Sequence, residues 1–171
     1  MIWSKGMIWP KGMICMDVRI VDFPETRVAL VEHLGPPDLE HETARRLVWW
    51  RLEMGLSVDR HWSYGVHHTD PRVTPPDRHR VDFCLSYDEE VAPNSYGVVT
   101  GIIPSCRCAV ARHLGSRARN DAAIHLLTRW LPESGESLGQ FPIFFHYVNV
   151  GPSISESEMI TDVYLPLNRA D

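Results

Sequence analysis

The stretch RVALVEHLG at residues 27–35 returns as RCAVARHLG at residues 107–115, 80 positions further along the chain. Each copy holds a short apolar run that ends in His-Leu-Gly, which is typical of a buried strand running into a turn. Aligning residues 24–55 with residues 104–135 needs no gap and gives ten identities in 32 positions. The same offset pairs Asp82 with Asp162 and Leu85 with Leu165. We therefore predict two related units, residues 17–87 and 97–167.

A helix is predicted after the repeated strand in each unit. Leu47 and Trp50 lie three residues apart in the first copy, and Leu127 and Trp130 repeat that spacing in the second. Apolar side chains at this spacing share one face of a helix, so that face is expected to be buried. A helix favours a residue with positive φ just beyond its end. The residues expected there are Gly55 and Gly135.

Further strands are predicted to close each unit, so that its element order is βαββ. Their approximate ranges are 62–68, 80–87, 142–149 and 159–166. One such unit leaves a sheet edge and a sheet face bare, and both are costly to expose. We therefore predict an α+β fold, a tandem pseudo-twofold repeat of two βαββ units with a ligand groove between them.

Composition fits a single domain, expected over residues 16–171. The chain is 44% hydrophobic and 23% charged, as soluble globular domains are. A chain of 171 residues can bury enough surface to fold without disulfide, metal or cofactor. None of the four cysteines lies in a zinc-type CxxC spacing, so we expect reduced thiols in the cytoplasm and no cofactor.

Charge and hydropathy argue against two kinds of partner. The net charge of −5 gives no basic face for nucleic acid, so direct binding to DNA is not expected. No apolar run approaches the ~20 residues that a membrane span needs. The start of the chain, MIWSKGMIWPKG, is a tandem copy rich in glycine and lysine, and we expect residues 1–15 to be a poorly ordered extension.

Three further stretches resemble a known family. They are TDPRVTPPDRHRVD at 69–82, WLPESG at 130–135 and PIFFHY at 142–147. With them, the chain from about Asp17 to Leu167 resembles the GyrI-like small-molecule-binding domain. That family includes the DNA gyrase inhibitory protein and the effector-binding domains of AraC-type and MerR-type multidrug regulators. The resemblance implies a groove that binds drug-like molecules.

Phe145 departs from the pattern of that family. The family's motif Pro-x-Phe-Glu-x-Tyr reads Pro142 to Tyr147 here, and Phe145 stands where the family has its glutamate. A carboxylate in an apolar groove rewards cationic lipophilic ligands, so its loss is expected to weaken that preference. His146 cannot simply replace the carboxylate, because adjacent strand residues point to opposite faces.

Candidate ligand-binding residues follow from strand alternation and from the repeat. Phe145 and Tyr147 share one strand face, and the 80-residue offset pairs them with Gly65 and His67. The helix tryptophans are also candidates, although ordinary helix core is an equally weighted alternative for them. The ligand-binding set is therefore Trp50, Gly65, His67, Trp130, Phe145 and Tyr147. No metal site is predicted, because His61, His67, His68 and His79 lack a fixed ligand spacing.

The sequence leaves three functions open. We rank first a domain that binds a hydrophobic, aromatic small molecule in its groove, for sensing or sequestration. Residues outside 17–167 leave no room for a DNA-binding segment, so sensing is expected to act through a protein partner such as a regulator. Inhibition of DNA gyrase by protein contact ranks second, and hydrolysis of cyclopropane-bearing genotoxins ranks third. Both alternatives come from the resemblance, and no catalytic residues are predicted, because no nucleophile and base have a recognisable spacing.

Overall fold

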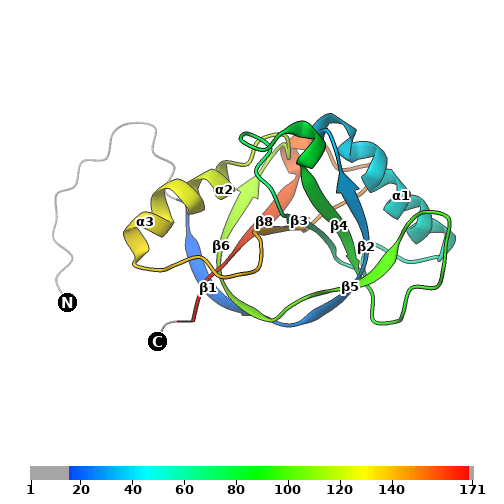
Figure 1. Ribbon diagram of the computed structural model, residues 1–171, viewed down its shortest axis with the longest axis horizontal. Coiled ribbons are helices and arrows are strands. Elements are labelled where there is room, and N and C mark those ends of the chain that lie inside the picture. The colour runs from blue at the N-terminus through cyan, green and yellow to red at the C-terminus, as the bar shows by residue number, and fades with distance from the viewer. Residues whose placement is uncertain (1–15, 170–171) are drawn as a thin grey trace.

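Eight strands in the described part of the chain, residues 16–169, form one antiparallel sheet in this computed structural model. Their order is β1-β6-β8-β7-β3-β4-β2-β5 (Figure 1). The strands are β1 Val18–Phe23, β2 Thr26–Leu34, β3 Ser63–His67, β4 Arg80–Ser86, β5 Val99–Ile103, β6 Cys106–Leu114, β7 Phe144–Tyr147 and β8 Ile160–Pro166. The α+β class predicted from the sequence is confirmed. The extension predicted at residues 1–15 lies outside the described residues.

Two helical segments follow the repeated strands. The first, α1, is a continuous helix from Glu40 to Glu53. The second begins as α2 (Asp121–His125), passes through a π-helical turn (Leu126–Trp130) and ends as α3 (Leu131–Ser134). Gly55 and Gly135 have φ of 66° and 76°, as expected for residues just beyond a helix C-terminus.

The bounds of the elements recur at the 80-residue offset. β2 and β6 are displaced by 80 residues at both ends, and so are β4 and β8. Read inward from its two edges, the sheet runs β1-β6-β8-β7 and β5-β2-β4-β3, which is the same order of corresponding strands. Superposition of the two halves, with Trp50 over Trp130, stays a prediction.

The predicted βαββ unit was wrong by one strand, because each half has a further strand before the repeated one. β1 and β5 precede the repeated strands, and each pairs with the other half of the chain. Val18 of β1 pairs with Ala111 of β6, and Thr26 of β2 pairs with Ile103 of β5. Both strands lie at an edge of the sheet, and several of their side chains are exposed. Half-exposed edge strands carry a weak apolar pattern, so the sequence did not reveal them.

The two helical segments cover the same face of the sheet and lie at opposite ends of the molecule (Figure 1). α1 packs on β2 and β4, where Leu47 and Trp50 join Val31 and Leu85 in one core. α2 packs on β6 and β8 around the fully buried Leu126. Between the two helical segments the sheet face over β3 and β7 is left for a site.

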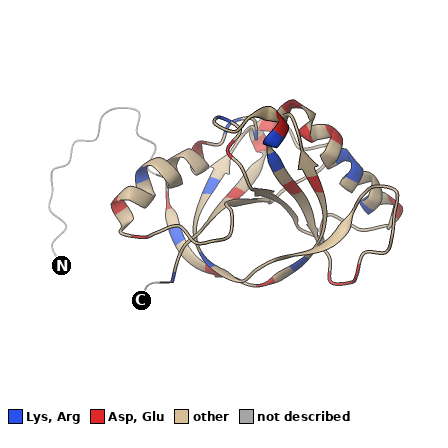
Figure 2. Cartoon of the chain, viewed as in Figure 1, with Lys and Arg blue, Asp and Glu red and all other residues tan. Residues whose placement is uncertain are grey.

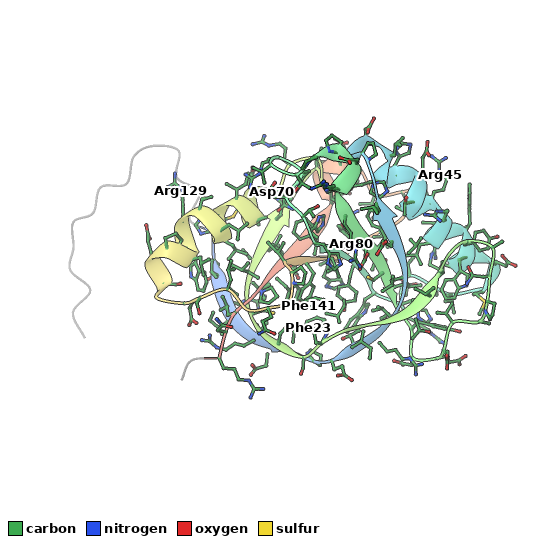
Figure 3. The ribbon with its side chains drawn as sticks, in the orientation of Figure 1. Phe23, Arg45, Asp70, Arg80, Arg129 and Phe141 are labelled. Atoms are coloured by element: carbon green, nitrogen blue, oxygen red, sulfur yellow. The ribbon has the colours of Figure 1, made fainter. Side chains whose placement is uncertain are left out.

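A third core fills the opposite, curved face of the sheet. Phe23 contacts Phe144 edge to face with ring centroids 4.9 Å apart, and Phe144 stacks on Tyr164 at the same distance. Phe141 packs against this cluster, and Figure 3 shows it beside Phe23. Aromatic pairs of this kind add about 0.5–1.5 kcal/mol beyond their burial. This face is filled by side chains, so the site lies on the face that carries the helices.

The repeated His-Leu-Gly phrase has a structural role. His33 is buried, and its ring nitrogens lie 2.8 Å from Thr43 Oγ1 and 3.0 Å from the carbonyl of Pro36. His113 binds the carbonyl of Ser116 in the second half in the same way. Each histidine thus ties the end of a strand to the chain that leads into the helix. The glycine that follows has a positive φ in both copies, which a side chain would disfavour.

Charges of both signs are interspersed over the molecule. Figure 2 shows acidic and basic positions alternating along α1 and across the strands, without a continuous basic face in this view. No helix among residues 16–169 is both long and apolar enough to span a membrane.

Candidate ligand-binding site

The two halves of the chain meet where β3 pairs with β7 at the centre of the sheet. Gly65 lies opposite Phe145, and Ser63 lies opposite Tyr147. Because side chains alternate along a strand, Gly65, His67, Phe145 and Tyr147 all face the side that carries the helices. The structure thus brings together the four strand residues predicted from the sequence.

Gly65 leaves the space that Tyr147 occupies. A Cβ atom at Gly65 would overlap the hydroxyl end of the Tyr147 side chain, which therefore lies across β3. A glycine inside a strand commonly marks such a close approach. The absence of a side chain at Gly65 is what allows the phenol ring of the second half to lie against the first half.

A cavity of about 580 Å³ lies over this junction. Ligand cavities for drug-sized molecules typically measure about 300–1,000 Å³. Both halves of the chain line it, and its floor is aromatic. The lining includes Glu40 and Leu47 of α1, His67 of β3, Arg117 before α2, and Phe145 and Tyr147 of β7.

A second cavity, of about 570 Å³, adjoins the first. The two share a wall made of Glu40, His67, Arg117, Asn120 and Phe145. The second cavity extends between the 68–72 loop and α2, and Ile124 and Leu127 of the second helical segment line it. Phe145 therefore stands between two apolar spaces.

His67 is an uncharged aromatic group at neutral pH. Burial, with smaller contributions from His79 and His68, lowers its pKa from the ordinary 6.5 to about 4. Its ring lies on Phe145 with the centroids 4.1 Å apart. Its Nε2 is buried and has no hydrogen-bond partner among residues 16–169. The imidazole thus acts as part of the aromatic wall and carries one unsatisfied polar atom.

Tyr147 stays protonated, because burial, with a smaller effect of the Glu40 charge, raises its pKa well above the usual range. The guanidinium carbon of Arg117 lies 4.9 Å from the centroid of its ring. A cation placed over an aromatic face in this way is attracted by the ring's quadrupole. The cavity therefore ends in a basic group that is stacked on its aromatic floor.

A chain of hydrogen bonds behind the cavity holds Glu40. The amide of Arg80 donates to Thr69 Oγ1 over 2.9 Å, and the same oxygen lies 3.0 Å from Nδ1 of the buried His79. The Thr69 hydroxyl can then donate to Nδ1, and His79 donates from Nε2 to Glu40 Oε1 over 2.6 Å. The structure thus places a carboxylate on the cavity wall although the family's glutamate is absent.

Sequence reasoning missed Glu40 and Arg117 as parts of the site. Glu40 belongs to a helix whose charges balance, and such a pattern is typical of a solvated face. Arg117 is one basic residue in a short connection between a strand and a helix. Position 40 corresponds to position 120 under the repeat, and both line the two cavities, so the repeat itself offered a signal.

The two predicted tryptophans lie away from the cavities. Trp50 is 4% exposed and meets Tyr87 edge to face at 5.4 Å, under α1. Trp130 is half-buried and packs on the core beneath the second helical segment. Neither residue lines the cavity over β3 and β7. Their helical face points at the sheet directly below, which is the helix-core alternative stated above.

His146 lies on the opposite face from Phe145, as alternation predicts. Its ring lies 5.1 Å from that of Tyr64 and 5.8 Å from that of Trp62. No group of three or more potential metal ligands occurs within residues 16–169. The described site thus offers an aromatic floor, with the Glu40 carboxylate and the Arg117 guanidinium on the wall that its two cavities share.

Comparisons with known proteins identify relatives of this chain. A family model described as GyrI-like small molecule binding domain matches residues 16–168, which confirms the resemblance. The probable transcriptional regulator YgiV of Escherichia coli (strain K12) is 39% identical over 154 residues, covering 89% of this chain and 96% of that protein. The DNA gyrase inhibitor of Erwinia billingiae is 28% identical over 160 residues, covering 91% and 100%.

Solved structures show the same fold at low identity. The C-terminal domain of EcmrR gives a TM-score of 0.72 at 15% identity, covering 92% of this chain and all of that domain. In the EcmrR–DNA complex the TM-score is 0.73 at 13% identity, and the chain spans 60% of the EcmrR chain.

Proposed function

Because this chain belongs to the GyrI-like small molecule binding domain family, we propose that its central cavity binds a hydrophobic, aromatic small molecule. The binding serves to sense or to sequester that molecule. The observation that carries the proposal is the close contact of the Phe145 and His67 rings, whose centroids are 4.1 Å apart, at the wall shared by two cavities. An aromatic ligand placed there gains contact with three rings, because Tyr147 lines the same space.

The residue at position 145 sets the expected order of ligands. A phenyl ring adds apolar area and a stacking surface, which is worth about 0.5–1.5 kcal/mol beyond burial for an aromatic partner. A carboxylate at the same place would instead reward a cation. We therefore infer that flat, neutral aromatic compounds bind better than lipophilic cations of similar size.

The test is Phe145→Glu with a matched pair of dyes, one neutral and one cationic, titrated by isothermal calorimetry. The wild type is expected to bind the neutral dye roughly three- to tenfold more tightly, and the substitution is expected to reverse the order. Val148→Glu is the control, because this substitution adds the same charge at an exposed position outside the cavity lining. A wild-type preference for the cation that Phe145→Glu leaves unchanged would remove Phe145 from the binding site.

A regulatory role would then depend on a protein partner. The net charge of −5 and the interspersed charges in Figure 2 make direct binding of duplex DNA by these residues unfavourable. A relative named probable transcriptional regulator supports a place in regulation. Retardation of duplex DNA at physiological salt by the isolated chain would contradict this part of the proposal.

Gyrase inhibition is the second candidate function. It is favoured by the relative of Erwinia billingiae, which is named a DNA gyrase inhibitor and is matched over its whole length. A supercoiling assay with purified gyrase, run with the wild type and with Phe145→Glu, distinguishes the two functions. Inhibition that persists in Phe145→Glu would assign gyrase contact to a surface other than the cavity.

A further inference from the structure

Arg117 is held in a fixed position at the end of the aromatic floor. Its Nη2 donates to the carbonyl of Asn149 over 2.6 Å, and its Nε donates to Thr161 Oγ1 over 3.3 Å. The guanidinium carbon lies 4.9 Å from the centroid of the Tyr147 ring. These contacts come from β8, from the chain after β7 and from β7 itself. The side chain is therefore positioned before any ligand arrives.

Among the described residues this guanidinium has no acidic partner. Arg107 and Arg112 each donate two hydrogen bonds to one carboxylate, those of Glu136 and Asp162. No carboxylate oxygen of residues 16–169 lies within 4.0 Å of a nitrogen of Arg117, although the residue is half-buried. A partly desolvated cation without a counter-ion is costly. Burial accordingly lowers the pKa of Arg117.

Part of the Arg117 donor set remains unused. Within the described residues its Nη1 makes no hydrogen bond, whereas Nη2 and Nε are engaged. Arg117 lines both cavities, as Phe145 does. Glu40 lines them as well, but its carboxylate accepts from His79 and does not pair with Arg117. The cavity therefore offers an apolar aromatic surface beside an unpaired guanidinium.

We propose that Arg117 binds the carboxylate of an aromatic ligand whose ring lies on Phe145 and Tyr147. The inference rests on the proposed function, because it assigns a ligand class to the same cavity. A carboxylate matches the planar fork of the guanidinium and supplies the missing counter-ion. Phe145 favours this choice, since a glutamate at that position would place a second negative charge in the cavity.

The test uses 2-naphthoate and 2-naphthamide, which share one ring system and differ in charge. Isothermal calorimetry on the wild-type chain is expected to show the acid binding about tenfold more tightly than the amide, as a charge-assisted hydrogen bond predicts. In Arg117→Gln the two compounds are expected to bind equally. Arg117→Lys, which keeps the charge but loses the planar fork, is expected to retain part of the preference.

Arg19→Gln is the matched control. Its substitution changes the net charge by the same amount, but Arg19 is an exposed residue of β1 that lines neither cavity. It is expected to keep the tenfold preference. A thermal unfolding curve shows whether each variant is folded. If Arg117→Gln does not fold, the acid-to-amide affinity ratios of the wild type and of Arg117→Lys still decide the test.

Three results would overturn the inference. They are equal binding of acid and amide by the wild type, a preference that survives in Arg117→Gln, and a preference lost in Arg19→Gln. In each case both compounds still bind, so the proposed aromatic cavity stands. If neither compound nor any of the dyes binds the wild type, the proposed function itself fails.

Discussion

The two halves of the molecule differ in their helical segments although the strands before them are closely alike. α1 is one continuous helix, and Trp50 is buried beneath it. The second segment contains a π-helical turn that ends directly before Leu131 and Pro132. A proline within a helix cannot donate to the preceding turn and crowds its carbonyl, and Leu52 occupies the corresponding place in α1. The sequence without an internal proline thus forms a regular α-helix, and the sequence with Pro132 forms a helix with a π-helical turn.

The cavity walls differ between the halves in a complementary way. β3 has Gly65 and His67 where β7 has Phe145 and Tyr147, and of these four residues His67, Phe145 and Tyr147 line the cavity. The phenol ring of Tyr147 fits because Gly65 has no side chain. The difference between the two halves at position 65 therefore gives the Tyr147 ring room over β3.

The largest expected effect tests the two tryptophans against each other. Trp50→Ala is expected to lower the free energy of unfolding by about 3–5 kcal/mol, because it leaves a cavity in the core under α1. Trp130→Ala is expected to cost about 1–2 kcal/mol, since Trp130 is half-buried. Urea denaturation of both variants measures the difference. Equal losses would show that the π-helical turn does not change how the second tryptophan is buried.

The next effect concerns His67 of β3, which titrates at the position where β7 has Tyr147. Folding lowers the pKa of His67 from 6.5 to about 4, so the unfolded chain binds the proton first as the pH falls. The stability present above pH 6.5 is therefore lost as the pH falls toward 4, with about 2 kcal/mol lost between pH 7 and pH 5. Denaturation curves at these two pH values measure the loss.

His67→Phe is the control for this prediction. It removes the titrating ring and the unsatisfied Nε2 while it keeps a flat aromatic side chain against Phe145. The variant is expected to lose much less stability between pH 7 and pH 5. His146, whose pKa burial also lowers, accounts for part of what remains. An unchanged loss in His67→Phe would assign the acid sensitivity to other groups.

The smallest effect compares the starts of the two helices. Asn120 accepts a hydrogen bond from the amide of Ala123 and so caps α2, whereas Leu39 before α1 offers no side-chain cap. Asn120→Ala is expected to cost about 1 kcal/mol of unfolding free energy, and Leu39→Ala less than about 0.5 kcal/mol. Chemical denaturation resolves the difference. A cost at Leu39 equal to that at Asn120 would mean that capping does not distinguish the two helices.

Much of the frame could be predicted from the sequence because it is encoded locally. The apolar runs that end in His-Leu-Gly became β2 and β6, and the glycines at 55 and 135 follow the helices. Alternation alone placed Phe145 and Tyr147 on one face and His146 on the other. These inferences needed side-chain periodicity and backbone preference, which depend on near neighbours in the chain.

What escaped prediction depends on contacts between distant residues. β1 and β5 are recognisable as strands through their partners, which lie in the other half of the chain. The role of Glu40 rests on His79, 39 residues away, and that of Arg117 rests on the chain around Asn149 and on Thr161. The helix pattern alone does not distinguish a Trp50 that faces the groove from one in the helix core, because the outcome depends on the sheet beneath α1.

The pairing of β1 with β6 has a consequence for how the chain is made. Ala111 must have left the ribosome before Val18 can find its partner, so the N-terminal strand waits while some ninety later residues are synthesised. β5 likewise completes the sheet of the first half only after its own synthesis. Pairings of such long sequence separation slow folding, and a waiting strand is an unprotected edge that other chains can join. Folding of the first half therefore waits for synthesis of the second, and the two halves complete the sheet together.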